Sequence, residues 1–200
     1  VDDFNFLSLT SNDCVGMIKS YEDFARAFSE GTEQMRLNLS FFPLGEVTKY
    51  LQDWMNMKII HSHTHSELAF IINANSIPGN YYIYTDQLKL KRILINIISN
   101  SFKFTLSGSI TLVISKENIN CVPYLKFLIK DTGSGMNEVT LKNLFNPYCS
   151  NNDDKRNKEG CGLGLILAMR MSKSIGLGIN VKSEVNKGTE MWFYCEEREK

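Results

Sequence analysis

The segment from Leu90 to Thr105 constrains the fold of this chain more than any other part of the sequence. Its apolar residues recur at helical spacing and form one broad stripe, which consists of Leu90, Ile93, Leu94, Ile97, Ile98 and Phe102. Asn96, Asn100 and Lys103 follow at i, i+4 and i+7 on another side of the same helix. Because asparagine is a poor helix former, packing alone gives little reason for two of them here. Amide oxygens suit Mg²⁺ and a lysine suits phosphate, so this row predicts either a site for such ions or a helix whose asparagines simply face solvent.

The composition and charge exclude several classes of protein. The 200 residues, of which 43% are hydrophobic, can bury one ordinary core, and their formal net charge of zero makes nucleic acid an unexpected partner. No run approaches the roughly 18 apolar residues of a membrane span, and the first ten residues lack the basic region of a signal peptide. The five cysteines are widely spaced, which favours reduced thiols and a cytoplasmic compartment. Because the chain begins with Val1, we expect it to be part of a longer protein.

The remaining pattern predicts helices that pack on a mostly antiparallel sheet. Helical spacing of apolar residues predicts helices over 46–57, 90–105 and 165–174, and Asp86 is the expected N-cap of the second. Strands are predicted at 67–73, 81–84, 108–116, 122–131, 178–184 and 189–195, and the third and fourth of them should form a hairpin across 117–121. These elements together predict an α+β fold, a two-layer sandwich.

Three further motifs follow the asparagine-bearing segment in order. They are the segment 131–136 with its two glycines, the segment 144–148 around Phe145, and the glycine-rich segment 160–165. With the asparagine row, they resemble the asparagine box, first glycine box, phenylalanine box and second glycine box of the ATP-binding domain of sensor histidine kinases. That domain belongs to the Bergerat-fold ATPases, which include gyrase, MutL and the ninety-kilodalton heat-shock chaperones. The resemblance extends over about residues 15–196 and implies the Bergerat fold, with ATP and Mg²⁺ as ligands.

The resemblance also implies how the nucleobase is recognised. Asp131 would accept a hydrogen bond from the amino group of adenine, although an aspartate before a glycine is also common in plain turns. Gly133 and Gly135 would let the backbone approach the nucleotide, or serve turn formation alone. Thr189 is similar to the family's threonine beside the adenine, and an ordinary strand threonine is the alternative.

Glycines just before a helix predict a phosphate site, because exposed amides at a helix N-terminus attract anions. In this region we expect the nucleotide to contact Gly160, Gly162, Leu163 and Gly164. We also expect it to contact two aromatic residues, Phe104 and Phe145. The polar segment 149–159 resembles the mobile lid over the triphosphate. Its Lys155, Arg156 or Lys158 could reach the phosphates, or simply be solvated loop charges.

The row on the asparagine-bearing helix separates two classes of enzyme. Asn100 matches the family's Mg²⁺ ligand, and Lys103 matches its basic residue near the phosphates. Asn96 differs from gyrase, MutL and the chaperones, which carry there a glutamate that activates water. An amide is not a useful base, so Asn96 disfavours an ATPase. It is the usual residue in histidine kinases, so we assign Asn96 and Lys103 to phosphate transfer.

Apolar residues near the start of the chain approximate the 3.5-residue spacing of a helical bundle, namely Val15, Ile18, Tyr21, Phe24 or Ala25, and Phe28. The resemblance implies that 1–31 holds part of a dimerisation-hairpin helix and that 32–200 is the ATP-binding domain, whose first strand would be 35–39. For the helix, packing on its own domain is the alternative. The implied activity is transfer of the ATP γ-phosphate to a histidine outside this chain, in a two-component phosphorelay. Implied partners are ATP or ADP, the hairpin, a second copy in a full-length homodimer, and a response regulator or receiver domain. A non-catalytic nucleotide-binding module is the second hypothesis.

The three histidines form one cluster, His61, His63 and His65. On an extended strand they would share one face and could bind a transition metal. Because no carboxylate or cysteine recurs nearby to complete a site, we interpret the cluster as a polar strand or loop without a ligand. None of the three lies in the family's phosphoacceptor pattern.

Overall fold

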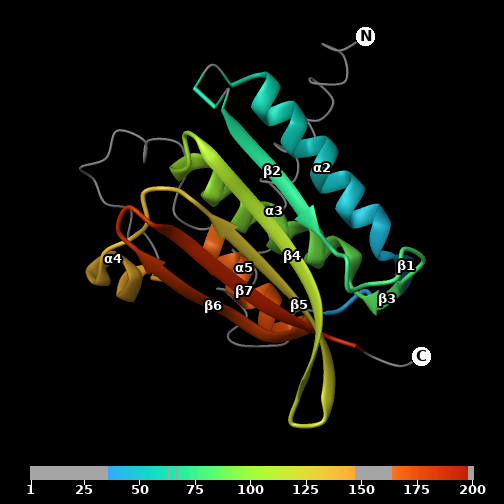
Figure 1. Cartoon of the computed structure of the whole chain (residues 1–200). Helices are drawn as coiled ribbons and strands as arrows, with labels where there is room; N and C mark the ends of the chain where they lie inside the picture. Colours follow the sequence, from blue (N-terminus) through green and yellow to red (C-terminus); the bar gives the residue numbers. More distant parts are fainter. Residues whose placement is uncertain (1–35, 63, 66, 147–163, 198–200) are drawn as a thin grey trace. The chain divides into compact units, whose positions relative to one another are not determined.

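The computed structural model describes residues 36–62, 64, 65, 67–146 and 164–197 of the chain (Figure 1). The described residues from Leu37 onward belong to one compact unit. The predicted N-terminal helix, the lid segment 149–159 and most of the second glycine box lie outside the described residues. No helix among the described residues is both long and apolar enough to cross a membrane.

The centre of the structure is a five-stranded sheet with the order β2-β4-β5-β7-β6. Its strands are β2 (Leu68–Asn73), β4 (Gly108–Ile119), β5 (Val122–Asp131), β6 (Gly176–Glu184) and β7 (Gly188–Glu196). β2 and β4 run parallel, and the other neighbouring pairs are antiparallel. Alternate side chains point to opposite faces, so one face buries Leu112, Phe127 and Phe193 while the other carries polar residues.

Helices cover the apolar face of this sheet. α2 (Leu44–Ile60) contacts β2, whereas α3 (Gln87–Phe104) and α5 (Gly164–Ile175) pack together behind the strands in Figure 1. Asp86 caps α3 as predicted, because its carboxylate accepts the backbone N–H of Lys89. The predicted stripe is buried from Leu90 to Ile98, and Phe102 is half-buried. The α+β two-layer sandwich is therefore confirmed.

A second, two-stranded sheet joins β1 (Ser40–Pro43) to β3 (Tyr82–Thr85). The predicted strand at 35–39 is wrong for its described part, since 36–39 is not a strand and the pairing begins at Ser40. The backbone N–H of Asn38 donates to the carboxylate of Asp86 at 2.9 Å and not to a neighbouring strand. Phe42 then enters the core, where it is 5% exposed.

The hairpin between β4 and β5 is longer than its sequence predicts. The expected loop at 117–121 is mostly strand, because the ladder continues to the pair of Ile119 with Val122. Asn120 and Cys121 alone make the turn, with φ of 53° and 65°. Two consecutive left-handed residues match the twist of a two-residue hairpin turn, which explains the longer strands.

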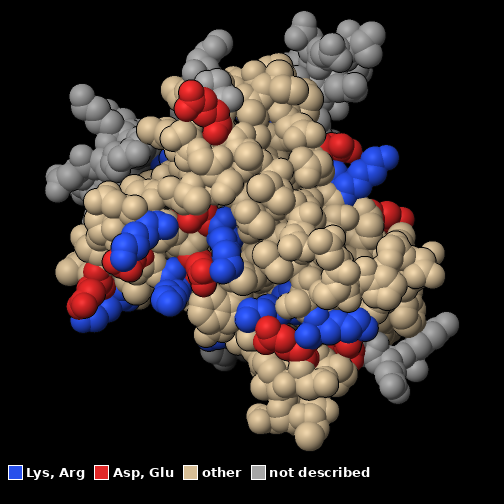
Figure 2. All heavy atoms as spheres, viewed as in Figure 1, with Lys and Arg blue, Asp and Glu red and all other residues tan. Residues whose placement is uncertain are grey.

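The face of the molecule in Figure 2 carries cations and carboxylates side by side. Lys130 pairs with Glu190 at 2.8 Å, and Lys126 pairs with Glu117 at 3.0 Å. The pair of Lys130 with Glu190 is exposed, and such pairs contribute roughly 0–1 kcal/mol each, so it does not hold the fold together.

Candidate functional site

The predicted adenine acceptor, Asp131, ends β5 and is held by donors from three parts of the chain. Its Oδ1 accepts the backbone N–H of Gly133 at 3.0 Å and that of Thr189 at 3.1 Å. Its Oδ2 accepts the hydroxyl of Ser101, on α3, at 2.9 Å. A carboxylate has about four acceptor positions, so these three bonds leave one free, on Oδ2.

Burial raises the pKa of Asp131, while the hydrogen bonds from Gly133, Ser101 and Thr189 act in the opposite direction. The net effect is a raised pKa, so this carboxyl takes up a proton at a higher pH than an ordinary aspartate. Only the ionised form offers both oxygens as acceptors.

We therefore expect the affinity for ADP to fall as the pH decreases through the raised pKa of Asp131. Titration calorimetry of the wild-type chain and of Asp131→Asn over a range of pH measures this effect. The amide does not titrate, so the variant should bind more weakly but without this pH dependence, and the comparison cancels protonation of the nucleotide itself. Parallel pH profiles for the two proteins would contradict the prediction.

The glycines of the first glycine box are required by the packing of the backbone itself. A Cβ on Gly133 would lie 2.5 Å from the carbonyl oxygen of Phe104 and 2.7 Å from the hydroxyl of Thr105. Gly135 has a φ of 64°, and a Cβ there would overlap the carbonyl of Glu184. No other residue fits at either position, so close approach of a nucleotide is not needed to explain them.

Thr189 connects this loop to the hairpin of β6 and β7. Besides its N–H bond to Asp131, its hydroxyl lies 2.9 Å from that of Ser183. The Ser183 hydroxyl also accepts the backbone N–H of Met136 at 2.9 Å. Thr189 therefore contacts Asp131 through its backbone N–H and Ser183 through its hydroxyl.

The asparagine row lies along α3 next to the start of α5. Asn96 and Asn100 are both half-buried, and neither side chain has a hydrogen-bond partner among the described residues. A Cβ on Gly164 would lie 2.9 Å from the amide oxygen of Asn96, so the first residue of α5 packs directly on Asn96. Asn100 precedes Ser101, the residue that bonds to Asp131, so the predicted metal ligand and base acceptor lie in one region.

The other predicted contact residues are only partly described. The ammonium group of Lys103 lies 5.3 Å from the ring centroid of Phe104, and both residues are half-buried. Phe145 is half-buried just after α4 (Glu138–Asn143). Of the second glycine box, Gly164 and Leu165 are described. Gly160, Gly162 and Leu163 lie outside the described residues, as do Lys155, Arg156 and Lys158.

Of the histidine cluster, His61 and His65 lie in the turn segment between α2 and β2 and not on a strand, whereas His63 lies outside the described residues. His65 is 8% exposed, with Nε2 at 3.0 Å from the carbonyl oxygen of Phe102 and Nδ1 at 2.9 Å from the hydroxyl of Thr64. Its ring stacks on that of Phe102, with centroids 4.0 Å apart. His65 therefore joins this turn to the end of α3. In the part of the chain that the structure describes, no group of three His, Cys, Asp or Glu could hold a metal ion.

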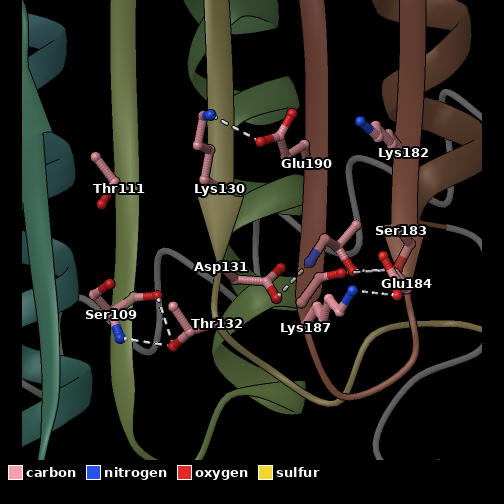
Figure 3. Close-up of a pocket in the computed structure, with 12 residues that line it drawn as sticks. Ser109, Thr111, Lys130, Asp131, Thr132, Lys182, Ser183, Glu184, Lys187 and Glu190 are labelled. Atoms are coloured by element: carbon pink, nitrogen blue, oxygen red, sulfur yellow. Dashed lines mark hydrogen bonds and ion pairs between the residues drawn. The ribbon is translucent and has the colours of Figure 1, made fainter.

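A depression of about 490 Å³ opens on the polar face of the sheet (Figure 3). Its lining consists of Ser109, Thr111, Lys130, Asp131, Thr132, Lys182, Ser183, Glu184, Lys187, Gly188, Thr189 and Glu190. It shares Asp131 and Thr189 with the region described above, but no residue of α3 lines it. The chemistry expected of Asn96 and Asn100 is therefore not in this depression.

Ser101 and Ser183 belong to the network around Asp131 but are not singled out by the motifs. Ser101 did leave a signal in the sequence, since it lies at i+4 from Ile97 and i+3 from Ile98 and so interrupts the buried stripe with a hydroxyl. The sequence contains no such signal for Ser183, because a serine is an ordinary residue at a polar position of an alternating strand.

Comparison with known proteins assigns the chain to a family of ATP-binding proteins. The sequence profile of the histidine kinase-, DNA gyrase B- and HSP90-like ATPases matches residues 85–199, and the chain belongs to this family. The signal transduction histidine-protein kinase BarA of Escherichia coli K12 is 26% identical over 196 residues, which cover 96% of this chain and 20% of BarA. The peroxide stress-activated histidine kinase mak2 of Schizosaccharomyces pombe is 36% identical over 121 residues, or 56% of this chain and 5% of mak2.

Solved structures share the fold at low sequence identity. Full-length ShkA in complex with AMPPNP superposes with a TM-score of 0.70 and 23% identity, over 95% of this chain and 37% of that one. The catalytic domain of the histidine kinase ThkA gives a TM-score of 0.62 and 18% identity, over 80% of this chain and 98% of that domain. The chain spans only about one fifth of the length of BarA.

Proposed function

We propose that this chain is the ATP-binding kinase domain of a sensor histidine kinase, which transfers the γ-phosphate of ATP to a histidine outside the chain. The observation that carries this proposal is the pair of half-buried asparagines on α3, Asn96 and Asn100. Ser101, which follows Asn100, donates a hydrogen bond to Asp131, the predicted adenine acceptor. Neither asparagine side chain has a hydrogen-bond partner among the described residues, and the amide of Asn100 is available to a ligand. The kinases BarA and mak2, which this chain resembles, support the same activity.

The chemistry of the donor groups fits a bound Mg²⁺ and a triphosphate. Asn100 offers an uncommitted amide oxygen, and Mg²⁺ usually takes one or two protein oxygens and completes its shell with water and phosphate. The ion would neutralise charge on the phosphates. Lys103, Gly164 and the glycines before it would hold the phosphates in line with the incoming imidazole, and Phe104 and Phe145 would contact the nucleotide. Positioning and electrostatics account for most of the rate in such transfers.

Asn96 distinguishes this proposal from an ATPase of the gyrase type. An amide cannot take a proton from water, and the first residue of α5 packs directly on the oxygen of Asn96. The γ-phosphate would therefore survive until the acceptor histidine reaches it. A non-catalytic nucleotide-binding module is the second candidate, and it is separated from the kinase by phosphate transfer to an added acceptor.

The remaining partners follow from the kinase proposal. The acceptor would lie on a dimerisation hairpin of the same protein, to which residues 1–31 contribute, with 32–200 as the ATP-binding domain. The full-length protein would be a homodimer that passes its phosphate to a response regulator or receiver domain. This domain would work in the cytoplasm, whether or not the full-length protein is anchored to a membrane.

Selectivity for adenine tests the assignment of Asp131. Guanine presents a carbonyl oxygen where adenine has its amino group, so the free acceptor position on Oδ2 would face another acceptor. A buried acceptor left without a partner costs about 1–3 kcal/mol, so GTP should bind roughly 5- to 150-fold more weakly than ATP. Competition of each nucleotide against a fluorescent ATP analogue measures the ratio, and equal competition would argue against this role of Asp131.

A further inference from the structure

Ser101 is a buried polar residue on a helix face that is otherwise apolar. It is 6% exposed and continues the stripe that Ile97 and Ile98 form on α3. Its hydroxyl donates to the carboxylate of Asp131 at 2.9 Å, across 30 positions of the sequence. A buried hydroxyl on such a face is unfavourable unless it has a partner, so Ser101 is explained by Asp131.

The three bonds to Asp131 decide which of its oxygens can receive a ligand. Oδ1 already accepts two backbone N–H groups, from Gly133 and Thr189, which occupy its two lone pairs. Oδ2 accepts only the hydroxyl of Ser101, so its second lone pair is the one left. An amino group recognised by Asp131 must therefore share Oδ2 with Ser101.

A second buried hydroxyl, that of Thr105, lies one helical turn after Ser101 and next to the first glycine box. Thr105 is fully buried, and its Oγ1 has no hydrogen-bond partner among the described residues. It lies against Gly133, whose N–H bonds to Asp131. Most buried hydroxyls in proteins have a hydrogen-bond partner, so the free Oγ1 of Thr105 indicates that a bound molecule, such as a ligand or a water, supplies one here.

We propose that Ser101 is a positioning residue that sets base specificity, because it fixes Oδ2 of Asp131 as the single acceptor for the exocyclic amino group of the purine. This inference rests on the proposed binding of adenine nucleotides. Without the hydroxyl, Asp131 is anchored through Oδ1 alone, and Oδ2 is free to turn or to take up water. Removal of the hydroxyl should therefore weaken the contact with the amino group and leave the other contacts of the nucleotide unchanged.

A thermodynamic cycle tests this inference by combining one change in the protein, loss of the Ser101 hydroxyl, with one change in the ligand, loss of the amino group. Calorimetry on the full chain would compare wild type and Ser101→Ala with two ligands, ADP and purine riboside 5′-diphosphate, which lacks the amino group. Ser101→Ala should weaken ADP roughly 5- to 10-fold, the effect of one ordinary hydrogen bond, and the amino-free ligand less than 2-fold. Ser101→Cys keeps the size with a weaker donor, so it should give an intermediate loss for ADP alone.

The matched control is Ser172→Ala. Ser172 is also a buried helical serine, but its hydroxyl donates to the backbone carbonyl of Met169 on α5. Its removal should leave the ratio of the two affinities unchanged. Equal weakening of both ligands by Ser101→Ala and Ser101→Cys would show that Ser101 only supports the fold, and would overturn the inference while leaving nucleotide binding intact. Absence of ADP binding by the wild-type chain would overturn the proposed function and this inference with it.

Discussion

Replacing Asp131 by alanine is expected to weaken ATP and ADP binding roughly 10- to 150-fold. This range corresponds to loss of a hydrogen bond to a charged acceptor, about 1.5–3 kcal/mol. Asn100→Ala should have a comparable effect on ATP in the presence of Mg²⁺ but a smaller one on ADP, because the amide oxygen acts through the ion and the triphosphate. Titration calorimetry with each nucleotide, with and without Mg²⁺, distinguishes the two variants.

The control for Asp131→Ala is Lys130→Ala on the same strand. Lys130 precedes Asp131 but points to the polar face, where it pairs with Glu190 at 2.8 Å. Its loss removes one exposed ion pair and should leave the affinity for ATP unchanged. If Asp131→Ala and Asn100→Ala both bind ATP as the wild-type chain does, the site is wrongly placed.

Stability must be measured beside affinity, because Asp131 also satisfies three donors. Its removal leaves the N–H groups of Gly133 and Thr189 and the hydroxyl of Ser101 without their acceptor. Each buried group without a partner costs about 1–3 kcal/mol, so the free energy of unfolding in urea should decrease. Asn100→Ala removes no such bond among the described residues and should unfold like the wild-type chain. It therefore tests the site without this complication.

The fold could be predicted where local and tertiary preferences agree. For α3, the N-cap Asp86, the helical spacing and the buried stripe all indicate the same element, and the structure contains it. The strand at 35–39 was mispredicted because a contact distant in sequence, from Asn38 to Asp86, takes the place of strand pairing. The β4–β5 hairpin was predicted too short because the left-handed backbone at Asn120 and Cys121 is not evident from these residue types alone.

The site could be predicted only in part, and for the same physical reason. The motifs identify Asp131 and Asn100 because their residue types and order are distinctive. They do not show what holds Asp131, since its donors Ser101 and Thr189 lie 30 and 58 positions away in the sequence. Such partners depend on the register of strands and on how a helix packs on them, which no local pattern contains.

Incubation of this chain with γ-labelled ATP is expected to give no labelled protein and phosphate release near background. A general base typically contributes 10²- to 10⁴-fold to a rate, and Asn96 cannot supply it. We do not expect His65 to supply an acceptor either. His65 is buried, and both of its ring nitrogens lie within hydrogen-bond distance of other groups, so neither is placed to attack a phosphate.

Addition of a hairpin that bears the cognate histidine should change this result. Label should then appear on the hairpin in an acid-labile form, because transfer needs chiefly a positioned imidazole in line with the γ-phosphate. Asp131→Ala should abolish that label by preventing ATP binding, whereas Lys130→Ala should retain it. Rapid phosphate release without a hairpin would indicate an ATPase, and label on His61, His63 or His65 would refute an acceptor outside the chain. Binding of ATP without transfer to any hairpin would leave a nucleotide-binding module, because the site would then hold its ligand without positioning it for attack.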